Sequence, residues 1–252
     1  LKGKEKELSF EEQCTLFRDR ATEAGFLYRS IPKQYGGSEQ ETDALSAQVI
    51  REEFGKKWAP MEARGIGTMM LAPTLLERGE QWMKDRWVQK TLFGEIKWCQ
   101  GYSEPGSGSD LASLKTRGEL VGDEWVINGQ KIWTSGAHLA NMIFAMVRTD
   151  PEAPKHRGIS YLLFSMEAPG ITVRPLEQMH GGRGFNGVFF EDVRVPVKNV
   201  VGEINRGWYV GATHLDFERS SIGMAVGQGQ MLNALRNYLQ DEEEKGSGKS
   251  VM

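Results

Sequence analysis

Two short segments of the chain carry residues suited to hold a large, flat ligand with phosphate groups. They are residues 101–110 (GYSEPGSGSD) and residues 128–137 (NGQKIWTSGA). The first is rich in glycine and serine, and the second places a tryptophan beside two hydroxyl side chains. Backbone N–H groups, hydroxyls and an aromatic face together suit such a ligand. Taken alone, each segment is also typical of an ordinary surface loop.

The common phosphate-binding motifs do not match residues 101–110. A P-loop needs a lysine after its last glycine, and no lysine follows Gly108. A Rossmann fingerprint needs a third glycine at the start of a helix, but Leu111 stands there and strands are expected next. Nucleotide binding by these residues would therefore use a different fold.

Length and composition are those of a soluble globular protein. The chain has 252 residues, 39% hydrophobic and 26% charged, which is enough for a sizeable core. A net charge of −3 gives no reason to expect nucleic acid or a membrane surface as partner. Cys14 and Cys99 stand far apart without a C-x-x-C motif, which suits a reducing compartment. Without a membrane-length apolar run or a signal peptide, we expect a bacterial cytoplasmic or a mitochondrial matrix protein.

The hydrophobic pattern divides the chain into three parts, residues 1–95, 96–204 and 205–252. The first part has helical spacing, and Ser9 with Glu12 forms a predicted capping box. Its later helices are expected at residues 41–55, 66–78 and 80–94. The second part has strand spacing, and helical spacing then returns. We predict an α+β multidomain fold with an N-terminal α-helical domain, a middle β-barrel-like domain and the incomplete start of a C-terminal helical bundle.

The middle part is predicted to contain a hairpin and several further strands. Residues 125–127 and 130–133 flank Asn128-Gly129, a pair typical of a type I′ turn. The other strands are expected at residues 141–148, 159–166, 171–175 and 187–196. Both glycine-bearing segments therefore fall within one β-rich region.

Five segments together resemble the acyl-CoA dehydrogenase family over nearly the whole chain. In order, they are residues 31–37 (IPKQYGG), 102–110 (YSEPGSGSD), 128–135 (NGQKIWTS), 188–196 (VFFEDVRVP) and 215–223 (LDFERSSIG). Five matches in the right order make a chance resemblance improbable. The resemblance implies tightly bound FAD, oxidation of an acyl-CoA to 2-enoyl-CoA in fatty acid metabolism, an electron-transfer flavoprotein as acceptor, and a homo- or heterotetramer.

The resemblance also assigns roles to residues of the two segments. Tyr102 and Ser103 would lie along the flavin ring, with the serine donating to its polar edge. Trp133, which by itself is typical of a core aromatic, would pack on the flavin, and Ser135 would bond near N5. Ser109 would lie by the pyrophosphate, where the CoA chain passes. The implied cofactor-binding residues are Tyr102, Ser103, Gly108, Ser109, Trp133, Thr134 and Ser135.

Glu218 is the expected catalytic base. The chemistry needs a base for the α-proton, hydrogen bonds for the enolate oxygen and a flavin N5 for the β-hydride. Many family members carry the base later, in the C-terminal bundle. A smaller branch, including isovaleryl- and long-chain-type enzymes, carries it in an L-D-x-E-R motif, which matches residues 215–219. Asp216 and Arg219 are then expected beside the substrate, although a Glu-Arg pair is also typical of a solvated helix face.

Other chemistries have little support in the sequence. The four histidines show no metal-ligand spacing, so no metal centre is expected. Ser107 and Ser109 stand in G-S-G-S rather than G-x-S-x-G, so a serine hydrolase is unsupported. A flavin oxidase of the same fold and a non-catalytic subunit of a heteromeric dehydrogenase both stay open. The length and branching of the acyl group stay open as well.

Overall fold

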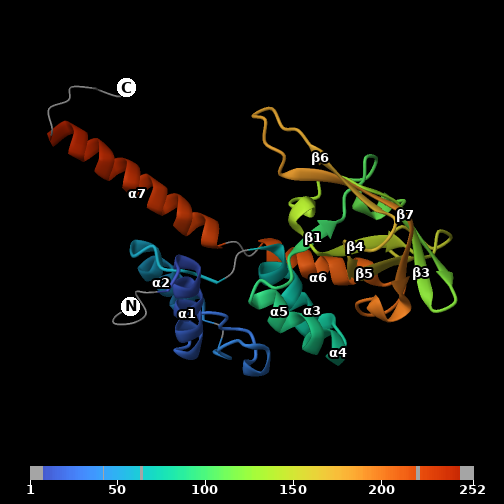
Figure 1. Ribbon diagram of the computed structural model, residues 1–252, viewed down its shortest axis with the longest axis horizontal. Helices are drawn as coiled ribbons and strands as arrows, with labels where there is room; N and C mark the ends of the chain where they lie inside the picture. The colour runs from blue at the N-terminus through green and yellow to red at the C-terminus, as the bar shows by residue number, and fades with distance from the viewer. Residues whose placement is uncertain (1–7, 42, 63–64, 220–221, 245–252) are drawn as a thin grey trace. The chain divides into compact units, whose positions relative to one another are not determined.

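The computed structural model describes residues 8–41, 43–62, 65–219 and 222–244 of the chain (Figure 1). The chain forms two compact units, one of residues 1–62 with 220–252 and one of residues 63–219. Both glycine-bearing segments belong to the second unit, so the site is built from its helices and its sheet.

In the described part of the first unit, the regular elements are helical. They are α1 (Phe10–Glu23), the 3-10 turn η2 (Lys33–Tyr35), α2 (Ala44–Lys56) and α7 (Ile222–Glu244). The predicted capping box is confirmed, because the Glu12 N–H donates to Ser9 Oγ and the Ser9 N–H donates to Glu12 Oε2 at 2.8 Å. The helix expected from residue 41 begins later, since the Asp43 carboxylate caps it by accepting from the N–H groups of Leu45 and Ser46.

The second unit begins with a pair of helical stretches and ends with a helix. The first stretch is the π-helical turn η3 (Gly67–Leu71) with α3 (Ala72–Arg78). The second is α4 (Gln81–Met83), the π-helical turn η4 (Lys84–Val88) and α5 (Gln89–Leu92). Helix α6 (Gly207–Arg219) follows the sheet and contacts both α3 and strand β5. These positions confirm the helical segments predicted at residues 66–78 and 80–94.

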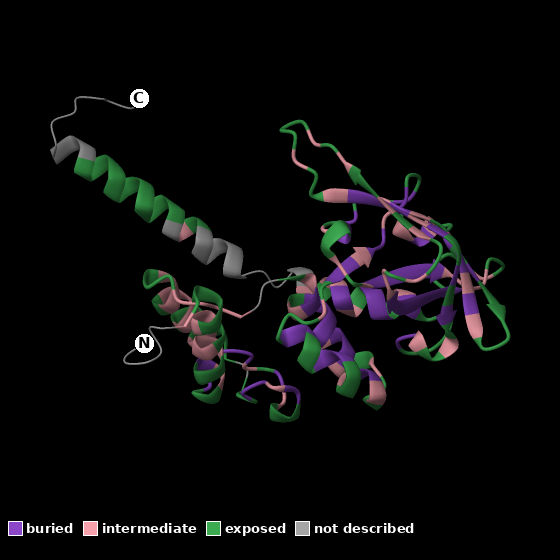
Figure 2. Ribbon diagram, viewed as in Figure 1, coloured by how far each residue is buried: buried purple, intermediate pink, exposed green. Residues whose placement is uncertain are grey.

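Within residues 65–219 the strands form one seven-stranded sheet. They are β1 (Trp98–Gly101), β2 (Arg117–Val121), β3 (Glu124–Lys131), β4 (Met142–Arg148), β5 (Ile159–Ser165), β6 (Ile171–Leu176) and β7 (Phe185–Pro196). Their order is β1-β4-β2-β3-β7-β6, and β5 pairs with β4. The sheet is curled, and its buried residues gather in the strands around β4 and β5 (Figure 2). The predicted fold class is confirmed.

The turn predicted at Asn128-Gly129 is wrong. The two-residue turn between β2 and β3 lies at Gly122-Asp123, and Val121 pairs with Glu124 across it. Asn128 and Gly129 lie inside β3, where the register against β7 shifts. Gly129 has φ +148°, and a Cβ there would lie 2.7 Å from the Thr116 Cα. The additional residue at this shift lies in β7, and Gly129 permits a close approach to Thr116, which the residue pair alone does not distinguish from a turn.

Substituting the two glycines should separate these roles. Gly129→Ala should lower the free energy of unfolding by roughly 3 kcal/mol or more, because an unfavourable φ is added to a clash with the Thr116 backbone. Gly122→Ala is the matched control, since its φ is +66° and a Cβ there meets nothing within 4 Å. It should cost only about 1–2 kcal/mol. Urea unfolding measures both free energies of unfolding. Equal losses in the two variants would contradict the close approach of Gly129 to Thr116.

Candidate functional site

A buried ion pair lies beneath the segment that follows β1. Lys131, at the end of β3, is fully buried, and its Nζ donates to Glu104 Oε1 at 2.8 Å and to the Tyr102 carbonyl oxygen at 3.0 Å. The Glu104 carboxylate also accepts from the backbone N–H groups of Lys115 at 2.6 Å and Thr116 at 2.9 Å. One pair of side chains therefore holds both ends of this loop against β3.

The two partners keep their charges at neutral pH. Burial raises the pKa of the Glu104 carboxyl, but the ammonium of Lys131 and the hydrogen bonds outweigh this and hold that pKa below its usual range. Burial lowers the pKa of Lys131 to about 8, although Glu104 opposes the shift. Sequence reasoning missed this pair. The available signal was spacing, because Lys131 continues the inward alternation of Trp125 and Ile127 along β3.

The second segment is joined to the first by the backbone. The Ile132 N–H donates to the Ser103 carbonyl oxygen at 2.9 Å. The next residues are fixed to the start of β7, because Thr134 and Asn186 exchange backbone hydrogen bonds of 2.9 and 3.1 Å. The buried Asn186 side chain donates to the same Thr134 carbonyl oxygen at 2.9 Å. Ser103 and the residues around Trp133 are thus brought together, as the sequence predicted for one site.

Trp133 is held in an outward position by this anchored loop. Its side chain is 60% exposed, and its backbone has φ +60°, a conformation that costs on the order of 1–3 kcal/mol for a residue with a side chain. The indole meets the ring of Phe185 edge to face, with centroids 6.2 Å apart. One aromatic face is therefore presented to solvent by a strained but well-anchored backbone.

The remaining expected cofactor residues differ in exposure. Tyr102 is buried and Ser103 half-buried, whereas Gly108, Ser109 and Ser135 are exposed. Thr134 is buried, and its Oγ1 has no hydrogen-bond partner among the described residues. A buried hydroxyl without a partner is energetically unfavourable.

The residues expected to act on substrate lie at the end of α6. Asp216 is exposed on this helix. Glu218 and Arg219 are in its last turn, but their side chains lie outside the described residues. The proposed base is thus placed by its helix only.

A buried histidine one turn earlier fixes that helix. His214 is 0% exposed, and its Nδ1 lies 3.2 Å from Tyr161 Oη on β5 and 3.3 Å from Thr74 Oγ1 on α3. Its Nε2 is buried without a partner among the described residues. Burial lowers the pKa of His214 to about 4, so the ring is neutral at pH 7. Sequence reasoning considered His214 only as a metal ligand and missed this role.

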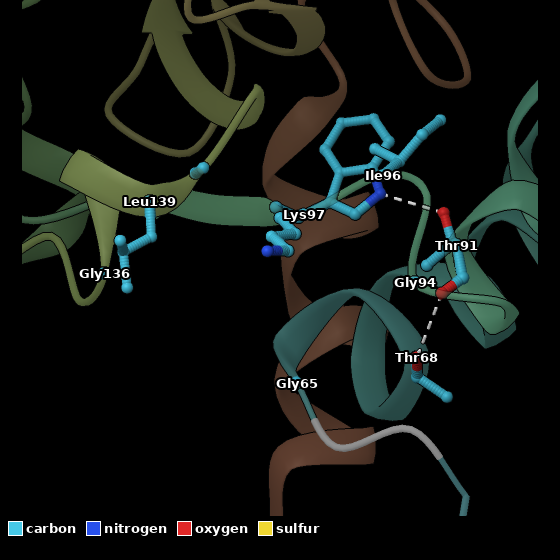
Figure 3. A pocket seen from close by; sticks show the side chains of 10 residues that line it. Gly65, Thr68, Thr91, Gly94, Ile96, Lys97, Gly136 and Leu139 are labelled. Atoms are coloured by element: carbon cyan, nitrogen blue, oxygen red, sulfur yellow. Dashed lines mark hydrogen bonds between the residues drawn. The ribbon is translucent and has the colours of Figure 1, made fainter. Parts of the chain in front are cut away.

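A pocket of about 280 Å³ opens beside the second segment. Its lining is Gly65, Thr68, Thr91, Gly94, Ile96, Lys97, Trp98, Gly136, Leu139 and Ala140. In Figure 3, Thr68 and Thr91 form the helical wall, and Gly136 and Leu139 form the opposite wall. The helical wall is held by hydrogen bonds from Trp98 Nε1 to Thr91 Oγ1 at 2.9 Å and from Thr68 Oγ1 to the Thr91 carbonyl oxygen at 3.4 Å. Because Gly136 directly follows Ser135, the pocket adjoins the expected flavin-binding segment.

Two kinds of feature are missing from the described ranges. Within residues 8–41, 43–62, 65–219 and 222–244, no three His, Cys, Asp or Glu side chains are grouped so that they could hold a metal ion. None of the helices in the same ranges has the length and apolar character needed to cross a membrane.

Comparison with known families is decisive. Residues 3–95 match the acyl-CoA dehydrogenase N-terminal domain, and residues 99–193 match the acyl-CoA dehydrogenase middle domain. The chain belongs to the acyl-CoA dehydrogenase family. This confirms the resemblance drawn from five short motifs. The family consists of flavoprotein oxidoreductases that normally bind FAD. Acyl-CoA dehydrogenase domains thus account for both glycine-bearing segments.

Relatives of known name cover most of this chain. It is 41% identical over 226 residues to the acyl-CoA dehydrogenase IpdE1 of Mycobacterium tuberculosis, which is 89% of this chain and 58% of that protein. It is 45% identical over 221 residues to the acyl-CoA dehydrogenase FadE34 of the same species, 88% of this chain and 30% of that protein. The chain therefore spans less than two thirds of these acyl-CoA dehydrogenases.

Solved acyl-CoA dehydrogenase structures share the fold. The Tcur3481-Tcur3483 steroid ACAD superposes with a TM-score of 0.76 and 35% identity, over 94% of this chain and 60% of that one. The ChsE4-ChsE5 complex from Mycobacterium tuberculosis has a TM-score of 0.65 and 34% identity, over 83% and 55% of the two chains. The titles of both structures name two different components.

The buried histidine of this acyl-CoA dehydrogenase chain should make stability depend on pH. The unfolded pKa is 6.5 and the folded pKa about 4, so the unfolded chain binds more protons between these values. The free energy of unfolding should therefore fall as the pH falls from 6.5 to 4, by on the order of 3 kcal/mol from this group. Protonation would place a charge on Nε2, which has no partner among the described residues.

Urea unfolding of His214→Asn at several pH values isolates this contribution. Without the imidazole, the free energy of unfolding should change less between pH 6.5 and 4 than it does in the unmodified chain. His180→Asn is the control, because His180 lies exposed at a turn, and its dependence should match the unmodified chain. An unaltered slope in His214→Asn would contradict the assignment.

Proposed function

We propose that this chain forms the N-terminal and middle part of a FAD-dependent acyl-CoA dehydrogenase. The enzyme would take the α-proton and the β-hydride from an acyl-CoA, give a 2-enoyl-CoA, and pass electrons to an electron-transfer flavoprotein. The observation that carries the proposal is the joining of the two segments. The Ile132–Ser103 hydrogen bond and the ion pair beneath it place hydroxyls and an outward indole side by side. The proposal keeps the three domains expected from the sequence, which are residues 1–95, 96–204 and 205–252.

The residues present fit a bound flavin. The unpartnered Thr134 Oγ1 and the strained, exposed Trp133 are features that a bound ligand would stabilise. Tyr102, Ser103 and Ser135 would hold the ring, and Gly108 with Ser109 would lie along the phosphates. When bound, FAD supplies a hydride acceptor.

The chain's own residues would supply the proton chemistry. Glu218 would accept the α-proton as a general base. Its helix is fixed one turn earlier, because the buried His214 contacts β5 and α3 at 3.2 and 3.3 Å. Arg219 and Asp216 would lie beside the substrate, and Ser109 beside the CoA chain. A base on a rigid helix stays aligned with its substrate, which general-base catalysis needs.

One observation supports a bulky substrate, and two support a partner chain. The solved relative at 35% identity is titled a steroid ACAD, so we propose a ring-bearing acyl group for this chain. The titles of both solved relatives name two components, which favours a heterotetramer over a homotetramer. Helix α7 supports association, since it exposes Met231, Leu232, Leu235, Tyr238 and Leu239 at helical spacing. The second candidate function is accordingly a non-catalytic subunit of such a complex.

Cofactor binding can be tested through Trp133. Trp133→Ala should raise the FAD dissociation constant about tenfold, because an aromatic face is removed from the ring. Trp58→Ala is the matched control, since Trp58 is 85% exposed and also has a positive φ of 51°. Fluorescence titration of the full-length protein gives both constants. Flavin released by heat should chromatograph as FAD, and recovery of FMN or a nicotinamide nucleotide would disprove the proposal.

The base can be tested by Glu218→Gln. Glutamine keeps size and hydrogen bonding but does not accept the α-proton, so anaerobic flavin reduction by acyl-CoA should slow by roughly 10²–10⁴-fold with FAD content unchanged. Arg219→Ala should mainly raise the apparent substrate constant, with a smaller loss of rate. If Glu218→Gln is reduced at the unmodified rate, the base lies elsewhere. A chain that holds no FAD would instead support the non-catalytic subunit.

A further inference from the structure

The buried ion pair between Glu104 and Lys131 is costly for the fold. The two side chains are 7% and 0% exposed, so both charges have lost their hydration. Replacing such a pair by neutral or apolar groups of similar volume is often neutral or stabilising. The stability of the fold is therefore a poor explanation for keeping these two charges.

The bonds of the pair point to a different role. Lys131 Nζ donates to the Tyr102 carbonyl oxygen at 3.0 Å, next to Ser103 in sequence. Glu104 stands on the other side of Ser103, and its carboxylate accepts from two backbone N–H groups where the loop returns, at residues 115 and 116. Ser103 is thus flanked on both sides by residues that the pair fixes, and its own carbonyl oxygen accepts from Ile132.

We propose that Glu104 and Lys131 are positioning residues for the flavin: they fix the backbone that presents the Ser103 hydroxyl and the Trp133 indole to the bound FAD. Neither touches the cofactor in this proposal, which rests on the proposed function. Trp133 lies two residues after Lys131. The pair therefore fixes the backbone beside both flavin-facing side chains, Ser103 and Trp133. A displacement of catalytic groups by about 1 Å can lower the reaction rate by a large factor.

Only one arrangement of charges satisfies these bonds. A carbonyl oxygen needs a donor and backbone N–H groups need an acceptor, so lysine and glutamate cannot be exchanged. Apolar replacements leave the Tyr102 carbonyl and the N–H groups of Lys115 and Thr116 without partners. The device therefore specifies a loop conformation rather than general stability, as polar groups with a complete set of partners do.

A double replacement separates positioning from stability. Glu104→Gln and Lys131→Met each leave one buried charge alone, so each should lower the free energy of unfolding and raise the FAD dissociation constant by at least about tenfold. The double variant Glu104→Gln/Lys131→Met leaves no charge. It should recover stability toward that of the unmodified protein, while its FAD dissociation constant stays raised because Tyr102 O has lost its donor. Glu119→Gln is the control. It breaks an exposed ion pair between Glu119 and Arg117, which both lie on β2.

The measurements are FAD titration by fluorescence, urea unfolding of the FAD-free protein, and circular dichroism of the bound flavin, which reports its environment. They are made on the full-length protein. If the double variant binds FAD as tightly as the unmodified protein and gives the same flavin dichroism, the pair is only structural and the proposal is wrong. A double variant that fails to fold would likewise place its role in folding. If the unmodified protein binds no FAD, the proposed function fails instead, independently of these variants.

Discussion

The site depends on one constraint, which is that two loops distant in sequence must keep a single relative position. The sheet alone does not supply this, because β1 and β3 are not neighbours in it. The buried contact of Glu104 with Lys131 bridges the gap, together with the Ile132–Ser103 hydrogen bond. A charge-assisted contact in a dry environment has a narrow range of geometries, whereas apolar packing tolerates shifts. Apolar packing of the fold therefore supplies stability, and the ion pair fixes the relative position of the two loops.

Helix α6 meets the same requirement in a different way. The helix carries the proposed base in its last turn, and an unanchored helix end frays. His214 prevents this one turn earlier, because its ring is enclosed by side chains of α3 and β5. A neutral imidazole packs in this place as a small aromatic with one polar edge, close to the rings of Phe144 and Tyr102. Its position would tie the base to the first cofactor loop, since the His214 ring lies 5.8 Å from that of Tyr102.

Much of the architecture could be predicted from the sequence, because period and caps are local properties. The strands at residues 142–148 and 159–165 follow from short, nearly continuous apolar runs, and the cap at Ser9 follows from one side-chain bond. The turn at Asn128-Gly129 was mispredicted, since glycine is needed both in a turn and where a strand lies very close to another segment, here at Thr116. The partners of Glu104 and His214 could not be predicted. They come from residues 27 and 140 positions away, and no local pattern encodes such contacts.

Three unfavourable features of this chain lie in the loops where a ligand is proposed to bind. The core cluster of the sheet is apolar and buried. The loops beside it hold a tryptophan at φ +60°, an unpartnered Thr134 hydroxyl and a desolvated ion pair. Each of these features opposes folding, and each faces or supports the surface assigned to the flavin. Because a bound cofactor stabilises only the folded state, it offsets such costs once present. A bound cofactor would thus compensate for the strain that these two loops carry.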